Sequence, residues 1–178
     1  MADELPAGAE RIDLDAEHER TLSEIDTLTD QLAEMDSDTE QYATLDRRSS
    51  RLDTHRRATE WVRDNWDVDE VVIRSLSFGD DARLDENTQS EAERRLWQIA
   101  IGTVEGPFLE HDGHAYPEVS MDAVEETVAT IDSPVVPIAV GRWLQDRIDE
   151  VSTVGNLAGD GSYATSLAAK RAATSTET

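Results

Sequence analysis

The sequence has no cysteine and only one lysine, Lys170, among its 178 residues. The absence of cysteine excludes disulfides, thiolate metal sites and a cysteine nucleophile. No apolar run approaches the roughly 18 residues that span a membrane, and the first four residues lack the basic start of a signal peptide. We therefore expect a cytoplasmic protein with no membrane partner.

Positive charge is also scarce, since 16 Lys and Arg residues accompany 40 Asp and Glu residues, for a formal net charge of -24. Binding to nucleic acid or to an anionic membrane requires a basic surface, so we expect neither partner. An acidic composition in which nearly all bases are arginine is typical of proteins from salt-loving archaea and their viruses, because carboxylates hold water and cations at high ionic strength. An acidic protein from a GC-rich bacterium is the alternative.

High net charge can also indicate disorder, but apolar residues make up 38% of this chain and recur at helical spacing. The four tryptophans all lie in such periodic stretches. The pattern predicts a mainly α protein with a small β element, of the α+β class. We expect an N-terminal helical hairpin or coiled coil, followed by a compact helical domain with one or two short strands.

The N-terminal third divides into a flexible arm at residues 1–11 and an acidic helical hairpin or coiled coil at residues 12–66. Turn and N-cap residues at 36–39 favour a bend there, with one unbroken helix as the alternative. Six arginines between residues 47 and 63 follow a strongly acidic segment. We therefore expect the two arms of the hairpin to pair through their charges.

The compact domain is expected at residues 67–152, and its best strand at 68–76. Ser77 is placed to cap a helix that extends to about residue 104 and is interrupted in its polar stretch. The remaining elements expected in this domain are a short hairpin and two helices. The hairpin has its turn at residues 111–114, between arms at 108–110 and 115–116, and the helices are at 119–131 and 136–151. Residues 153–178 are rich in Gly, Ala, Ser and Thr and predict a flexible tail.

Few residues are arranged for catalysis or metal binding. His111 and His114 lie three apart, but no third cluster with ligand spacing accompanies them, so a polar turn is the favoured interpretation. No Ser/His/Asp arrangement, phosphate loop or dinucleotide fingerprint is recognisable. We therefore expect no enzyme activity, no catalytic residue, no cofactor and no metal site.

The positive features are apolar helix faces that can be presented to another protein. Five residues on such faces are the candidate partner-binding residues: Leu22, Ile25, Leu28, Leu32 and Trp143. For each of them, a place in the core is the favoured interpretation. The helices could also associate with a second copy, so a homo-oligomer is left open.

Residues 71–84 (VVIRSLSFGDDARL) resemble a strand and helix start of tail assembly chaperones from long-tailed phages and haloarchaeal tailed viruses. In that family a phrase of the form V-x-V-R-x-L-s-x-G-(D/E) precedes a polar helix. Residues 103–109 and 136–151 are similar to the segments before and within its closing helices. The resemblance covers about residues 68–152, while the long acidic N-terminal segment departs from the family's pattern.

The resemblance implies a non-enzymatic factor that coats the tape-measure protein and helps to recruit tail-tube subunits in the host cytoplasm. The alternative is a structural component of the virion, such as a connector or scaffold. That protein would use the N-terminal helices as an oligomeric coiled coil.

We predict that the fold loosens at low ionic strength, because carboxylate repulsion is then poorly screened. At about 1 M KCl the Debye length is about 3 Å, which removes most of this repulsion. The melting temperature, followed by circular dichroism, should rise from dilute buffer to molar KCl. Melting curves that do not change with salt would contradict a halophilic surface.

Overall fold

The computed structural model describes residues 5, 8–109 and 120–157. These residues are mainly helical with a small antiparallel sheet, which confirms the predicted α+β class. The elements are, in chain order, β1 (Ala9–Asp13), α1 (Leu14–Ala33), α2 (Glu40–Trp66), β2 (Glu70–Arg74), α3 (Phe78–Asn87), α4 (Glu91–Gly102), β3 (Thr103–Glu105), α5 (Met121–Ile131) and α6 (Ile138–Leu157).

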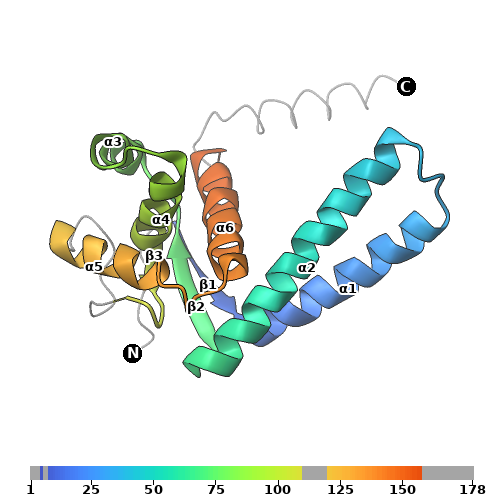
Figure 1. Ribbon diagram of the computed structural model, residues 1–178, viewed down its shortest axis with the longest axis horizontal. Coiled ribbons are helices and arrows are strands. Elements are labelled where there is room, and N and C mark those ends of the chain that lie inside the picture. Colours follow the sequence, from blue (N-terminus) through green and yellow to red (C-terminus); the bar gives the residue numbers. More distant parts are fainter. Residues whose placement is uncertain (1–4, 6–7, 110–119, 158–178) are drawn as a thin grey trace, which may run out of the picture.

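The sheet has the order β1-β2-β3, with β2 in the centre and antiparallel to both neighbours. Asp13 lies opposite Glu70, so β1 and β2 pair along their whole length. Helices α1 and α2 connect β1 to β2, and helices α3 and α4 connect β2 to β3. Figure 1 shows the α1–α2 hairpin extending to one side of the sheet, with α3, α4 and α5 on the other side and α6 between them.

Strands β1 and β3 were not predicted from the sequence. The expected flexible arm at residues 1–11 is wrong from Ala9 onward, because these residues form β1 and Ile12 enters the core at 3% exposure. The expected helix to about residue 104 ends at Gly102, after which β3 pairs with β2. The described residues therefore contain three strands, where one or two were expected.

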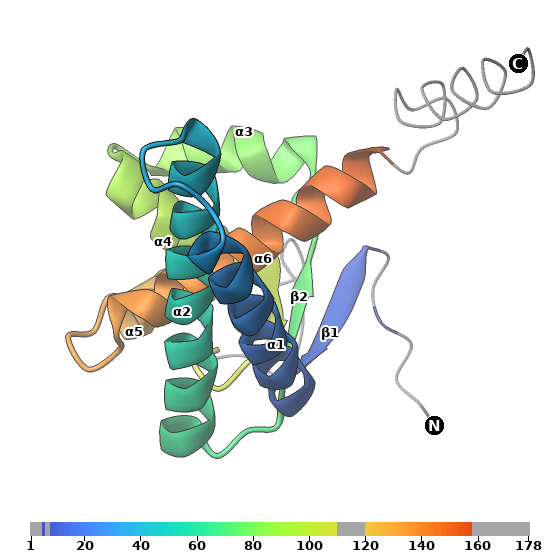
Figure 2. The same cartoon turned by 90° about the vertical axis from the view of Figure 1, so that its right-hand side faces the viewer.

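The predicted bend between the first two helices is confirmed. Thr39 caps the start of α2, since its hydroxyl accepts a hydrogen bond from the Tyr42 N–H at 3.1 Å. At the other end of α2, Asp67 adopts a left-handed conformation with φ of 50°, which turns the chain into β2. Figure 2 shows α2 crossing α6, with α1 beside α2.

The charge pairing expected between the hairpin arms is only partly correct. Arg48 pairs with Glu24, and Arg63 pairs with Asp15 at 2.8 Å, so two arginines of α2 do reach α1. The others have different partners: Arg56 and Arg57 pair with Asp53 in their own helix, and Arg51 lies 3.7 Å from Asp146 in α6. Arginines at 47–63 therefore also join the hairpin to the rest of the protein.

The core lies between the sheet, α2, α4 and α6. Trp143, Leu144 and Ile148 of α6 are buried together with Val62 of α2 and Ile73 of β2. Helix α6 extends to Leu157, so the expected tail is wrong for its first five residues; the rest of it, residues 158–178, lies outside the described part. The turn of the expected hairpin, at residues 111–114, also lies outside it, and Phe108 and Leu109, at its expected start, are not in a strand.

A buried ion pair joins β2 to α3. The guanidinium of Arg74 donates hydrogen bonds to both carboxylate oxygens of Asp80, at 2.9 and 3.1 Å. The predicted cap at Ser77 is confirmed, because the Ser77 hydroxyl accepts from the Asp80 N–H while the Asp80 carboxylate accepts from the Ser77 N–H. Burial is the largest influence on the pKa of Asp80 and raises it, but the hydrogen bonds from Arg74 and Ser77 together bring that pKa below its usual value.

We predict that Asp80→Asn lowers the free energy of unfolding by about 3 kcal/mol or more, because it leaves a buried guanidinium without its counter-charge. Since the pKa of Asp80 is lowered by folding, the carboxylate stabilises the protein above the unfolded pKa of about 4, and this contribution is lost as pH falls through the folded pKa. Urea unfolding should show a constant deficit at neutral pH that shrinks in acid. Asp81→Asn, at the exposed neighbour, is the matched control and should cost less than about 1 kcal/mol. An equal effect of the two substitutions would contradict this role.

Candidate docking groove

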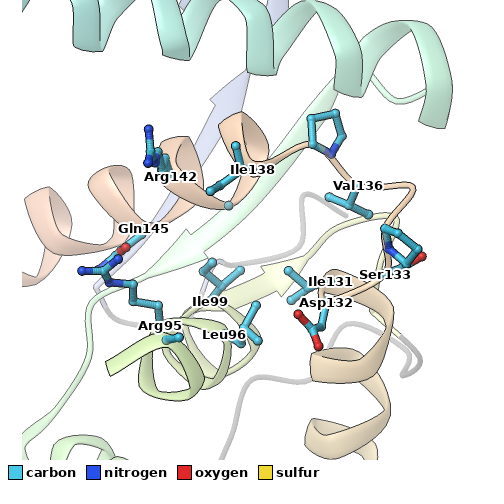
Figure 3. Close-up of a pocket in the computed structure, with 14 residues that line it drawn as sticks. Arg95, Leu96, Ile99, Ile131, Asp132, Ser133, Val136, Ile138, Arg142 and Gln145 are labelled. Atoms are coloured by element: carbon cyan, nitrogen blue, oxygen red, sulfur yellow. The ribbon is translucent and has the colours of Figure 1, made fainter. Parts of the chain in front are cut away.

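A groove with a volume of about 390 Å³ lies between α4, the α5–α6 connection and the start of α6 (Figure 3). Its floor is apolar and is formed by Leu96 and Ile99 of α4, Ile131 of α5 and Val136 of the connection. A groove of this size and lining suits apolar side chains of a ligand or partner.

The short connection between α5 and α6 shapes the lip of the groove. Its turn is held by hydrogen bonds from the Val136 N–H to the Ser133 carbonyl at 3.0 Å and from the Val140 N–H to the Pro137 carbonyl at 2.9 Å. Val135 and Ile138 are 74% and 73% exposed in this region, and Ile138 lines the groove. Two large apolar side chains are thus held in water beside an apolar floor, which is typical of a contact surface.

Gly141 keeps the groove open. A Cβ atom at this position would lie 3.8 Å from Ile99 Cδ1, which is an ordinary contact, so core packing does not require glycine here. Gly102 differs, since a Cβ there would lie only 2.7 Å from Ile148 Cδ1. The absence of a side chain at Gly141 therefore leaves space in the groove. The absence of a side chain at Gly102 instead permits close contact between α4 and α6.

The two ends of the groove differ in charge. Figure 3 shows Arg95, Arg142 and Gln145 toward one end, and Asp132 and Ser133 toward the other. Asp132 is the one carboxylate among the described residues of the lining, and no histidine is among them. This composition suits binding through apolar contact and charge, and provides no general acid–base pair.

Arg142 also interacts with Asp146, a residue of α6 that contacts α2. The pKa of Asp146 is lowered, first by its hydrogen bond with His55 Nε2 at 2.8 Å and further by the positive charges of Arg51 and Arg142, while burial acts in the opposite direction and raises it. His55 is 5% exposed in its side chain and joins α2 to α6 through this bond. The contact has a structural role beside the groove.

The five predicted partner-binding residues lie elsewhere than the groove. Leu28 and Trp143 are 4% and 0% exposed, so their assignment to a contact surface is corrected to a place in the core. Ile25 and Leu32 are half-buried in α1, and Leu22 is 40% exposed. No member of this set lines the groove.

The groove residues were missed because the sequence analysis expected only a helix at residues 136–151 and chose Trp143 as the candidate contact residue in it. A usable signal was present: Val135 and Ile138 flank prolines in a turn, where apolar side chains are hard to bury. Gly141 was the second signal, since glycine inside a helical pattern requires a reason.

Other site types find little support in the described part of the chain. No group of three or more metal-ligating side chains is present among these residues, and His111 and His114 lie outside them. None of the described helices combines the length and the apolar character needed to cross a membrane.

Comparison with known proteins returned no match to a family model, a curated protein or a solved structure. The residues that carry the resemblance at 71–84 nevertheless have a structural explanation. Arg74, Ser77 and Asp80 form the buried ion pair and the helix cap, so this motif connects a strand to a helix.

We predict that Gly141→Ala raises the free energy of unfolding by about 0.5–1 kcal/mol, because alanine favours the helix and its methyl group has room. Gly102→Ala, the matched control in α4, should instead destabilise by about 1–3 kcal/mol through the clash with Ile148. Urea unfolding of both variants measures the contrast. Destabilisation by Gly141→Ala would show that this glycine is needed for the fold.

Proposed function

We propose that this protein is a non-enzymatic tail assembly chaperone that binds the tape-measure protein through the groove between α4 and α6. In this proposal it acts in the host cytoplasm and helps to bring tail-tube subunits to the tape-measure protein. The observation that carries the proposal is the apolar groove with Ile138 held 73% exposed at its lip.

The charge of the chain supports a role in keeping an apolar partner soluble. A net charge of -24 on 178 residues gives each complex a strongly charged exterior, and like charge opposes aggregation. The groove supplies contact while the acidic surface supplies solubility, so one domain can perform both tasks. The resemblance at residues 68–152 supports the assignment to tail assembly, since it includes both α4 and most of α6.

A structural virion component is the second candidate. It is favoured by the α1–α2 hairpin, which extends from the body and carries Leu22 at 40% exposure. Helices arranged in this way suit association with a second copy or with a virion protein.

The test is co-expression of the full chain with a tape-measure protein from the same genome. The tape-measure protein should remain soluble and co-purify with this chain. Ile138→Asp should reduce co-purification about ten-fold, because it removes the burial of one large apolar side chain. The substitution should leave folding intact, since Ile138 is exposed and an acidic residue suits the start of a helix.

Leu22→Asp is the matched control on the hairpin, since it exchanges another exposed aliphatic residue for aspartate. The groove proposal expects little loss with Leu22→Asp. Loss with this variant and full binding by Ile138→Asp would move the contact to the hairpin. A tape-measure protein that stays insoluble in the presence of the wild-type chain would contradict the chaperone function.

Mass spectrometry of purified particles separates the two candidates. A chaperone should be absent from the mature particle or present in traces, whereas a connector should be present at the copy number of a ring. Stoichiometric incorporation would favour the structural component.

A further inference from the structure

The positive end of the groove is unusual for this protein. Acidic residues outnumber basic ones by 40 to 16, and most arginines in the described residues pair with a carboxylate. Arg95 is exposed and has no ion-pair partner among the described residues. Arg142 is also exposed. It interacts with the charge of Asp146, but that carboxylate already accepts a hydrogen bond from His55 and lies 3.7 Å from Arg51.

We infer that the groove binds an amphipathic acidic segment of the partner protein, with an apolar side chain over Gly141 and carboxylates beside Arg95 and Arg142. This inference rests on the proposed function and specifies the chemistry of the segment that is bound. Apolar contact with the floor supplies most of the affinity, and the two guanidinium groups select for negative charge.

The opposite end gives the segment a direction. Asp132 lies there, so a carboxylate placed at that end would meet a like charge, whereas a carboxylate at the α4–α6 end meets Arg95 and Arg142. A segment with its acids on one side of its apolar anchor therefore fits in one orientation. A segment with basic flanks would place a cation against both arginines and is disfavoured.

A partner protein fits this site better than a second copy of the chain. Helices α1 and α5 of this protein are acidic and amphipathic, but their apolar sides already pack within the chain, α1 on α2 with Leu28 buried and α5 on α4 with Val124 buried. The occupant is thus expected to come from another chain.

The test uses three fluorescent helical peptides with one shared pattern of leucines and with Glu, Gln or Lys at the flanking positions. Anisotropy measures their binding to the full-length protein at about 1 M KCl, where a Debye length of about 3 Å leaves contacts at the groove and removes the long-range repulsion of the acidic surface. We expect the Glu peptide to bind about three- to ten-fold tighter than the Gln peptide, and the Lys peptide to bind weakest.

Two double variants test the role of the arginines. Arg95→Glu with Arg142→Glu should reverse the order, so that the Lys peptide binds best. Arg47→Glu with Arg57→Glu makes the same change of charge on α2, outside the groove, and should leave the order unchanged. Gly141→Leu should abolish binding of all three peptides, because its side chain would fill the groove above Ile99.

Any other result of the peptide assay overturns the inference. Comparing it with the co-purification assay shows whether the proposed function also fails. If the three peptides bind equally and Gly141→Leu abolishes their binding, the groove is a docking site without selectivity for acidic segments. If no peptide binds but Ile138→Asp still reduces co-purification of the tape-measure protein, the proposed acidic segment is rejected and the chaperone function is kept. Insensitivity of both assays to Gly141→Leu and Ile138→Asp rejects both. Self-association in sedimentation experiments that Gly141→Leu removes would identify a second copy as the occupant.

Discussion

The burial of strand β2 is the constraint on which the rest of this structure depends. Four of its five residues are buried, from Val71 to Arg74, so side chains on both faces of the strand are withdrawn from water. An arginine in that position needs a counter-charge, and Asp80 provides it from the first turn of α3. The pair fixes where the strand ends and the next helix begins, and so helps to set the position of α4, which forms one wall of the groove.

Helix α6 connects the parts of the molecule that have different tasks. One side of it contacts α2 through the half-buried Asp146–His55 hydrogen bond, and the other faces α4 through close contact at Gly102. Arg147 links the same helix to Glu10 of the edge strand at 2.7 Å. A partner that contacts the first turns of α6 therefore touches the element with which the hairpin, the sheet and α4 all make contact.

The sequence predicted those features that local chemistry determines. The bend between α1 and α2, the caps at Thr39 and Ser77 and the interruption before α4 each depend on side chains within a few residues of the place they act. Strands β1 and β3 were missed because three to five residues carry little periodic signal, and their pairing with β2 joins segments far apart in the chain. Apolar periodicity identified Trp143 and Leu28 as inward-facing on a helix, but periodicity alone does not distinguish a core from an interface. The groove combines residues of three elements, and so required the tertiary arrangement.

The α1–α2 hairpin is inserted between two strands that pair directly, with Asp13 opposite Glu70 and the Leu14 N–H bonded to the Asp69 carbonyl. Helix α2 is about 40 Å long for its 27 residues, yet none of its residues before Leu52 is buried. Whole turns can therefore be added at the tip, after Leu28 of α1 and before Leu52 of α2, without disturbing the base of the insertion. The reach of this arm can therefore lengthen by whole helical turns while the body and its sheet stay the same.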